Sequence, residues 1–386
     1  MPNRRPATLF LLIPGFQMLF LIMAPAVLVG QDSDPGDVQF AKRVKEWRQI
    51  IVELQLLRQE YFLAENFDSS AELRKKYDET KEKGNRKIRE LKMAACKAFR
   101  DKPRVGAEYH AFLINSLAFD LEQTEDQGIA FEMAKALATL PVSRADVARR
   151  VGMSMFINSE FDQAKKFLQQ AVNANESGME EFKLQLRLIP RFKPLWEKEL
   201  EYRKADSQKK MPRAVFETTK GRFVVELFED NAPNTVKNFV TLARKGFYND
   251  LDFFYVLPFQ FCGTGSPNST FTGSPGYVLE NEGLNPETRR GNFRGTLCAP
   301  SRDEGLANIA GSIFMITFMP YSEANTDKYC NFGRVIEGME VVDALNRSQS
   351  AAGEPVEDFK ADKILKVTVE NLRDHDYKAK VIPLNQ

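Results

Sequence analysis

Residues 250–267 read DLDFFYVLPFQFCGTGSP, and this stretch decides the fold because one strand pattern ends in it and another begins. Aromatic and β-branched residues up to Leu257 predict a strand over about 253–257, and Pro258 predicts its end. A second short strand is expected over about 260–263, before a turn rich in glycine, serine and proline. Two short strands this close together predict a β-rich domain.

The rest of the C-terminal half repeats this pattern. The segment 214–230, AVFETTKGRFVVELFED, alternates apolar and polar residues about a Lys220-Gly221 turn and predicts a hairpin. Helices are expected over 234–247 and about 339–346. Further strands are expected at about 295–299, 312–317, 329–334 and 363–372. Many short strands with only two helices are typical of a closed antiparallel barrel.

Residues 38–202 have a different, helical periodicity. Apolar residues from Val38 to Leu57 recur at three- and four-residue steps, as on one face of an amphipathic helix. A second, charged helix is expected over about 70–99, antiparallel to the first. The polar segment 203–213, RKADSQKKMPR, breaks the periodicity. The predicted organisation is a leader at 1–30, a linker at 31–37, an all-α helical domain at 38–203, a linker at 204–213, the barrel domain at 214–373 and a C-terminal tail at 374–386.

The segment 145–175, ADVARRVGMSMFINSEFDQAKKFLQQAVNAN, resembles one tetratricopeptide repeat. The matching small and large residues are Gly152, Phe161, Ala164, Leu168 and Ala171. Small residues let two helices approach closely while large ones fill the space between pairs. Ordinary packing of a helical hairpin explains the same residues, and both interpretations are open. The repeat interpretation implies a concave face that binds a peptide segment or a protein partner.

Composition excludes several classes of function. The chain has 386 residues, 43% of them apolar and 28% charged, which is typical of a globular protein with two domains. Its 54 basic and 53 acidic side chains give a net charge of +1 without a long run of one sign, so no nucleic acid partner is expected. The only histidines are His110 and His375, and the four cysteines lack C-x-x-C spacing, so no metal site is expected either. Buried free thiols and one disulfide are both open for the cysteines.

The N-terminal residues predict export. Arg4-Arg5 precede a charge-free apolar run from Leu9 to Gly30, with small residues at 24–26. This pattern is typical of a secretory signal peptide, although the run is also about long enough to span a bilayer as an N-terminal anchor. Pro14 and Pro25 interrupt it and favour a cleaved signal. We therefore expect a periplasmic or secreted protein, or one on the outer face of a membrane.

The C-terminal half resembles cyclophilin-type peptidyl-prolyl isomerases. The matching segments are LFEDNAPNTVKNFVTLARKGFYNDL (227–251), GSPGY (273–277), RGTL (294–297), GSIFMIT (311–317) and FGRVIEGMEVVDAL (332–345), in the family's order and near its spacing. The resemblance covers about 214–372 and implies an eight-stranded antiparallel β-barrel capped by two helices. It also implies a substrate groove on the outside of the barrel.

The reaction that this resemblance implies is rotation about X-Pro peptide bonds, which have a barrier of about 18–20 kcal/mol. No covalent bond is broken, so no nucleophile, metal or cofactor is implied. The family uses an arginine that donates to the proline nitrogen, glutamines that position the peptide backbone, and an apolar pocket for the proline ring. The implied partners are proline-containing or extended protein segments.

The groove residues of this chain differ from the family's, whereas the frame matches. An ungapped match of YNDLDFFYVLP (248–258) places the family's His-Arg pair on Phe254 and Tyr255, so the catalytic arginine is absent. The two glutamines fall on Gly263 and Ile313. The family's tryptophan falls on Glu323 or Ala324, and its histidine falls on Tyr329. With Tyr255 at the arginine position, the candidate substrate-binding positions are Phe254, Gln260, Phe261, Gly263, Pro300, Ser301, Ile313, Met315, Ala324 and Tyr329.

Two functions are therefore open. One is an exported isomerase whose catalysis is impaired by the missing arginine, with the Tyr255 hydroxyl as the candidate donor. The alternative is a non-catalytic scaffold that binds peptides or proteins through the helical domain and a re-shaped groove. In either case the new aromatic and apolar residues fill the former groove or line an open one.

Overall fold

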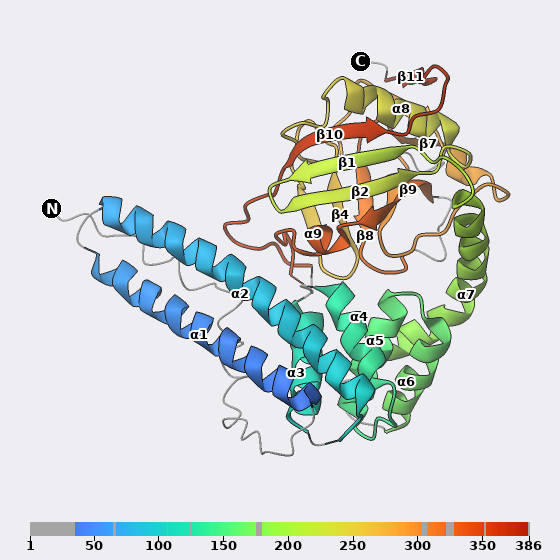
Figure 1. Ribbon diagram of the computed structural model, residues 1–386. Coiled ribbons are helices and arrows are strands. Elements are labelled where there is room, and N and C mark those ends of the chain that lie inside the picture. The colour runs from blue at the N-terminus through green and yellow to red at the C-terminus, as the bar shows by residue number, and fades with distance from the viewer. Residues whose placement is uncertain are drawn as a thin grey trace. The chain divides into compact units, whose positions relative to one another are not determined.

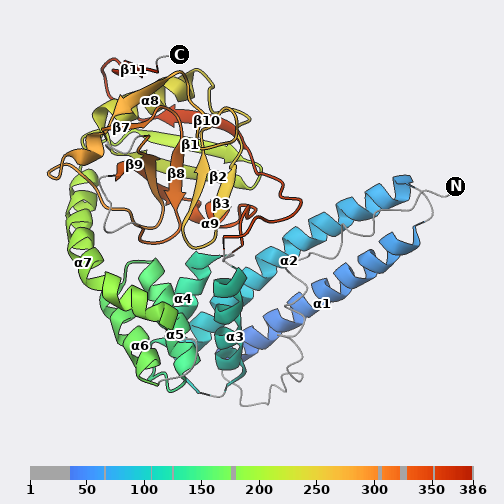
Figure 2. The ribbon, with the colours of Figure 1, turned by 180° about the vertical axis from the view of Figure 1, so that it is seen from behind.

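The computed structural model describes residues 35–64, 67–105, 107–123, 126–174, 180–302, 307–321, 328–350 and 353–384 (Figures 1 and 2). The predicted leader at 1–30 lies outside these residues, and so does Ala324. The chain divides into two compact units. The first unit comprises the described residues up to Gln123 together with Ile129–Ser143. The second unit comprises the described residues of the short segment 124–128 and those from Arg144 onward.

The first unit is helical, as predicted. Its helices are α1 (Pro35–Leu63), α2 (Phe67–Asp101), α3 (Glu108–Gln123) and most of α4 (Gln127–Leu137). The long helices α1 and α2 lie side by side and antiparallel (Figure 1). Because proline fits the first turn of a helix, α1 begins at Pro35, and the last residues of the predicted linker 31–37 are helical. A buried ion pair between Lys92 and Asp120, 2.6 Å long, joins α2 to α3.

None of the helices in the described residues is both long enough and apolar enough to cross a bilayer.

The second unit begins with three helices, α5 (Ala145–Ile157), α6 (Phe161–Asn173) and α7 (Glu180–Asp206). Helices α5 and α6 form a close hairpin, because a Cβ at Gly152 would lie only 2.8 Å from Cγ of Leu168. Helix α7 is bent and contains Pro190 and Pro194, which remove backbone hydrogen bonds (Figure 1). A single hairpin satisfies both the tetratricopeptide interpretation and ordinary helix packing, so the choice between them stays a prediction.

The predicted antiparallel barrel with two helices is confirmed. Its eight-stranded sheet has the order β10-β1-β2-β9-β6-β8-β4-β3. The strands are β1 (Arg213–Thr218), β2 (Gly221–Leu227), β3 (Tyr255–Leu257), β4 (Phe261–Thr264), β6 (Thr296–Pro300), β8 (Phe314–Thr317), β9 (Tyr329–Glu337) and β10 (Ile364–Glu370), with helices α8 (Pro233–Arg244) and α9 (Met339–Asp343). Backbone hydrogen bonds from Phe253 to Asp362 (2.8 Å) and from Ile364 to Leu251 (2.9 Å) connect the two ends of this order.

A small second sheet was not predicted from the sequence. It has the order β11-β5-β7, from β5 (Tyr277–Glu280), β7 (Asn308–Ala310) and β11 (Ile382–Pro383). The C-terminal tail therefore packs on the barrel domain. Tyr377 in the tail is buried, and its hydroxyl donates to a carboxylate oxygen of Glu229 (3.1 Å).

Aromatic side chains dominate the barrel interior. Phe216 and Phe223, paired across the β1–β2 hairpin, stack with ring centroids 4.6 Å apart. Phe239 of α8 and Phe314 of β8 pack against Phe216 from the other side of the core. The alternation that predicted the hairpin thus places its apolar residues inside, against the predicted inner face of α8.

Helix α7 is joined to the barrel through Arg290, whose side chain is 0% exposed. Its Nε and Nη2 atoms donate to the Glu199 carboxylate (both 2.8 Å), and Nη1 donates to Asp206 (2.7 Å). The guanidinium also lies over the Phe228 ring, 3.7 Å from its centroid. Helix α7 ends at Asp206, inside the predicted linker 204–213, and the ion pair with Arg290 stabilises this last turn. Strand β1 begins at Arg213.

All four cysteines are buried free thiols, which settles the alternative that the sequence left open. Burial raises the pKa of Cys262 and Cys330 from an ordinary value of 9.0 to about 12, and it also raises the pKa of Cys298. No group of three or more His, Cys, Asp or Glu residues that could hold a metal ion occurs in the described part of the chain.

Replacing Arg290 should destabilise the second unit strongly. Arg290→Gln removes the buried cation that Glu199 and Asp206 share, and breaking a buried ion pair costs about 3–5 kcal/mol. Denaturant unfolding of the full chain measures the change. The matched control is Arg289→Gln, which removes a neighbouring, partly exposed arginine. Equal effects of the two substitutions would contradict the role of Arg290.

The buried thiols predict a loss of stability at high pH. A thiol whose folded pKa is raised stabilises the fold fully below its unfolded pKa near 9.0 and loses that contribution as the pH rises toward 12. The free energy of unfolding should therefore fall by about 1.4 kcal/mol per pH unit for each buried thiol in this window. Cys262→Ala should make the fall in the free energy of unfolding with pH less steep by the contribution of one thiol. Denaturant unfolding at a series of pH values measures this slope. An unchanged slope would contradict this assignment.

Candidate functional site

The candidate groove lies on the outer face of strands β3, β4 and β8. Tyr255 pairs with Gly263 across β3 and β4, and Gly263 pairs with Met315 across β4 and β8. Directly paired residues of adjacent strands share a face of the sheet. Their neighbours Val256 and Cys262 are fully buried in the barrel interior. We call the outer surface that carries Tyr255, Gly263 and Met315 the groove face.

An aromatic cluster covers part of the groove face. Tyr255 and Phe261 stack with ring centroids 5.5 Å apart. Phe271, from the loop 266–276, packs against this pair and against Phe254, with centroid distances of 5.0 Å to Phe254, 5.3 Å to Tyr255 and 6.4 Å to Phe261. We use the name aromatic cluster for Phe254, Tyr255, Phe261 and Phe271.

The missing side chain at Gly263 makes room for Phe271. A Cβ at Gly263 would lie 3.3 Å from Cζ of Phe271 and 3.6 Å from Cζ of Phe254, which is already tight. The longer glutamine that the family resemblance implies at this position would occupy the space of the Phe271 ring. A glutamine at position 263 and the Phe271 ring would therefore compete for the same space.

Arg302 holds the loop that carries Phe271. Its Nη1 donates to the backbone carbonyl of Phe271 (2.7 Å), and its Nη2 donates to that of Thr272 (3.3 Å). Phe271 is nevertheless 39% exposed, so one edge of the aromatic cluster faces solvent. The sequence reasoning missed Phe271 and Arg302. The available signal was that Phe271 is the one large apolar residue in SPNSTFTGSPG (266–276).

A second set of aromatic contacts continues from Phe261. Tyr321, also missed from the sequence, lies 5.5 Å from Phe261 and 6.1 Å from Tyr329 between ring centroids. Burial raises the pKa of Tyr321. Pro300 pairs with Tyr329 across β6 and β9. The predicted positions 300 and 329 are thereby linked to the aromatic cluster.

The remaining predicted positions offer little to a ligand. Ile313 and Met315 are 1% and 3% exposed, so both serve as packed wall. Gln260 lies in the β3–β4 turn, where its backbone carbonyl accepts from the Phe318 amide (2.8 Å). The Ser301 hydroxyl donates to the Asn308 carbonyl (3.3 Å). Ala324 lies outside the described residues.

The chemistry of the groove face follows from these side chains. Among the predicted positions that the structure describes, none is Asp, Glu, His, Lys or Arg. The neighbouring cation, Arg302, is hydrogen-bonded to its own loop. The face therefore presents aromatic rings and tyrosine hydroxyls, and it lacks an acid–base pair or a nucleophile within this set.

Comparison with known proteins identifies the barrel. Residues 213–369 match the family model for "Cyclophilin type peptidyl-prolyl cis-trans isomerase/CLD". The chain is 34% identical over 147 residues to peptidyl-prolyl cis-trans isomerase-like 1 of Aspergillus fumigatus, which covers 38% of this chain and 89% of the relative. It is also 34% identical over 148 residues to a peptidyl-prolyl cis-trans isomerase of Helicobacter pylori, covering 37% of this chain and 86% of the relative.

A solved cyclophilin-type peptidyl-prolyl cis-trans isomerase of Cryptosporidium parvum is 24% identical, with a TM-score of 0.36, and covers 42% of this chain and 98% of its own. Through residues 213–369, this chain belongs to the cyclophilin-type peptidyl-prolyl cis-trans isomerase family.

Proposed function

We propose that the barrel binds proline-containing or extended protein segments on its aromatic cluster and turns them over slowly. The observation that carries this proposal is the position of the cluster. Tyr255, at the place of the family's arginine, is covered by Phe261 and Phe271. Aromatic rings, which can bind a peptide, therefore occupy the position where a charged donor would stabilise the transition state of isomerisation.

The aromatic cluster suits a proline ring for a physical reason. Aromatic side chains bury large apolar areas at low entropic cost, and aromatic-lined grooves are used elsewhere to recognise proline-rich segments. An extended proline-containing segment is already stiff, so it loses little freedom when it binds. The exposed edge of Phe271 and the half-buried Phe254 supply such a surface.

Slow turnover follows from the missing donor. Isomerisation is accelerated only by interactions that strengthen in the transition state, and removal of one well-placed donor typically costs ~10²–10³ in rate. The Tyr255 hydroxyl can donate a hydrogen bond, but it is uncharged and rigid, and its reach differs from that of a guanidinium. Both backbone-positioning glutamines are also absent, at Gly263 and Ile313.

We further propose that the protein is exported. The support is the charge-free apolar run from Leu9 to Gly30 behind Arg4-Arg5. An exported foldase or peptide-binding protein would meet unfolded clients after they cross the membrane.

Exchange NMR with a short Ala-Pro peptide and the full chain tests binding and turnover together. We expect saturable shifts of the peptide signals, with cis–trans exchange at least ~10²-fold slower than with an equal concentration of the Helicobacter pylori relative. Phe271→Ala should weaken binding by about tenfold, the equivalent of one or two aromatic contacts. Phe62→Ala, at an exposed phenylalanine of α1, is the control and should change nothing.

Two results would overturn this proposal. Exchange as fast as with the relative, and lost in Tyr255→Phe, would mean that a phenol has replaced the arginine. Absence of both shifts and exchange would exclude the groove face and favour a scaffold function of the helical part.

The double variant Tyr255→Arg with Phe271→Gly should raise the exchange rate, because it restores a charged donor and opens the space in front of it.

N-terminal sequencing tests export. The full-length chain, expressed in a bacterial host and recovered from the periplasmic extract, should begin after the apolar run that ends at Gly30. Protein with an intact N-terminus in the cytoplasmic extract would contradict export, whereas an intact N-terminus in the membrane fraction would identify an anchor.

A further inference from the structure

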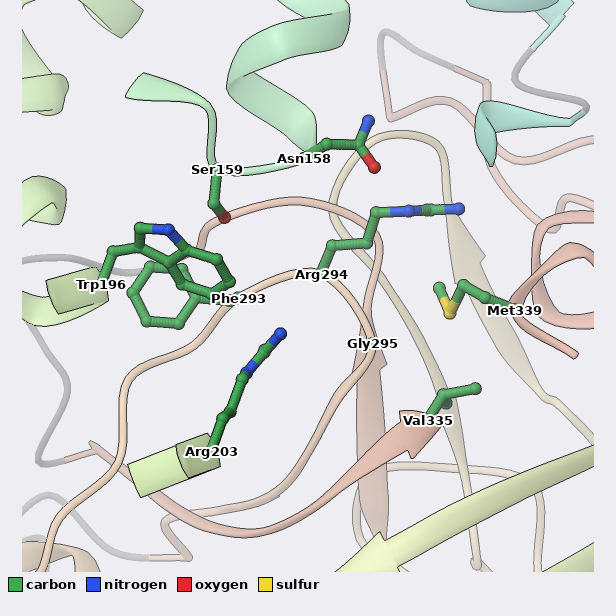
Figure 3. Close-up of a pocket in the computed structure, with 9 residues that line it drawn as sticks. All are labelled: Asn158, Ser159, Trp196, Arg203, Phe293, Arg294, Gly295, Val335 and Met339. Atoms are coloured by element: carbon green, nitrogen blue, oxygen red, sulfur yellow. The ribbon is translucent and has the colours of Figure 1, made fainter. Parts of the chain in front are cut away.

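A cavity of about 200 Å³ lies in the second unit, apart from the groove face (Figure 3). It is open to solvent and is lined by residues of the α5–α6 turn, helix α7, the segment that leads into β6, strand β9 and the start of α9. None of its lining residues is a predicted groove position. The function of the groove face therefore gives no account of this cavity.

Aromatic and apolar side chains form one part of the cavity wall, and polar side chains (Asn158, Ser159, Arg203 and Arg294) form the rest. Trp196 of α7 and Phe293 of the barrel meet at a centroid distance of 4.7 Å, edge to face. Val335 of β9 and Met339 of α9 line the opposite part of the cavity (Figure 3). Phe293 is in turn fixed by contacts with Phe161 and Phe192 of the helices. The wall is thus preformed and would accept a flat or apolar body.

Arg203 supplies a cation with spare hydrogen-bond donors. Its Nε donates to Glu199 (2.9 Å), and its guanidinium lies 4.6 Å from the centroid of the Trp196 ring. Its two Nη groups have no hydrogen-bond partner among the described residues, and the side chain points into the middle of the cavity (Figure 3). The other lining cation, Arg294, is instead engaged with Asp343 through both Nη atoms (2.9 and 2.6 Å).

Arg203 shares its acidic partner with two other arginines, Arg290 and Arg334, which also pair with Asp206 and Glu226 respectively. Its one acidic partner, Glu199, also accepts from Arg290 (2.8 Å) and lies 3.9 Å from Nη1 of Arg334, a buried nitrogen without a hydrogen-bond partner. Burial lowers the pKa of Arg203, Glu199 offsets part of this effect, and the guanidiniums of Arg334 and Arg290 lower the pKa further. A negative charge in the cavity would give the Nη groups of Arg203 an acidic partner of their own.

Ser159 adds a second polar group. It is 4% exposed, and its hydroxyl has no hydrogen-bond partner among the described residues, although it is directed into the cavity (Figure 3). Its backbone has a φ of 65°, a conformation that is uncommon for serine and that places this side chain at the cavity rim. Because the hydroxyl lies at the cavity surface and has no protein partner in the described part of the chain, it can form a hydrogen bond with a ligand there.

We propose that this cavity binds a small carboxylate with an aromatic or apolar body. The carboxylate accepts hydrogen bonds from the Nη groups of Arg203 and from the Ser159 hydroxyl. The body lies against Trp196, Phe293 and Met339. A free aryl carboxylate and the C-terminal residue of a peptide share this chemistry.

The two tryptophans of the chain make the test specific. Full-length protein labelled with nitrogen-15 at tryptophan has indole signals from Trp196, in the cavity, and Trp47, in the first unit. Phenylacetate should shift the Trp196 signal saturably and leave the Trp47 signal in place. Phenylacetamide, its neutral counterpart, should bind at least tenfold more weakly. The peptide Ala-Ala-Phe, with a free or an amidated C-terminus, distinguishes a peptide source from a free acid.

Variants locate the site. Arg203→Gln should weaken phenylacetate binding at least tenfold, whereas Lys204→Gln, at the exposed next residue of α7, should leave it unchanged. Val335→Phe should abolish binding by filling the cavity, so the test does not depend on whether Arg203→Gln folds. Equal binding of acid and amide, equal effects at 203 and 204, or no saturable shift of the Trp196 signal would each overturn the proposal.

Discussion

The second unit depends on one buried guanidinium. Arg290 cannot lose its proton under ordinary conditions, and with no exposure to water it requires acidic partners on the facing element. Glu199 and Asp206, seven residues apart on one face of the last turns of α7, are those partners. The contact fixes the direction in which α7 leaves the helices and the position of the segment that leads into β6. Phe293, three residues after Arg290, is thereby held against Trp196.

The groove face is held together by aromatic packing. The rings of Phe254, Tyr255, Phe261 and Phe271 contact one another and need no polar partners on this face. No buried polar group is left behind at Gly263, because the space is filled by Phe271 from another loop. The framework residues of β3 and β4 keep their inward apolar positions, so the barrel core is unaffected.

Sequence patterns were sufficient for the strands and helices of the main sheet and for the fold class. The alternation in 214–230 and the helical spacing in 234–247 reflect burial of one face, which each segment encodes locally. The strands β5 and β7 were missed because they are short and their register depends on partners far away in the chain. The tail strand β11 was missed for the same reason. Of the candidate site, Tyr255, Ile313 and Met315 could be assigned from the sequence because they fall inside matched segments, whereas Phe271 lies in a loop whose path no local pattern specifies.

Local sequence patterns therefore specify a helical region followed by a barrel, and they place aromatic and apolar residues at the positions that form the groove face. These features depend on residue identity and on local periodicity, because short-range sterics and the burial of one face act within each segment. The tertiary structure alone decided that Phe271 occupies the space above Gly263, that the cysteines stay unpaired, and that Arg203 faces a cavity beside Trp196. Each of these three features requires contacts between side chains that are distant in the sequence. Close packing determines such contacts only when the whole unit is folded.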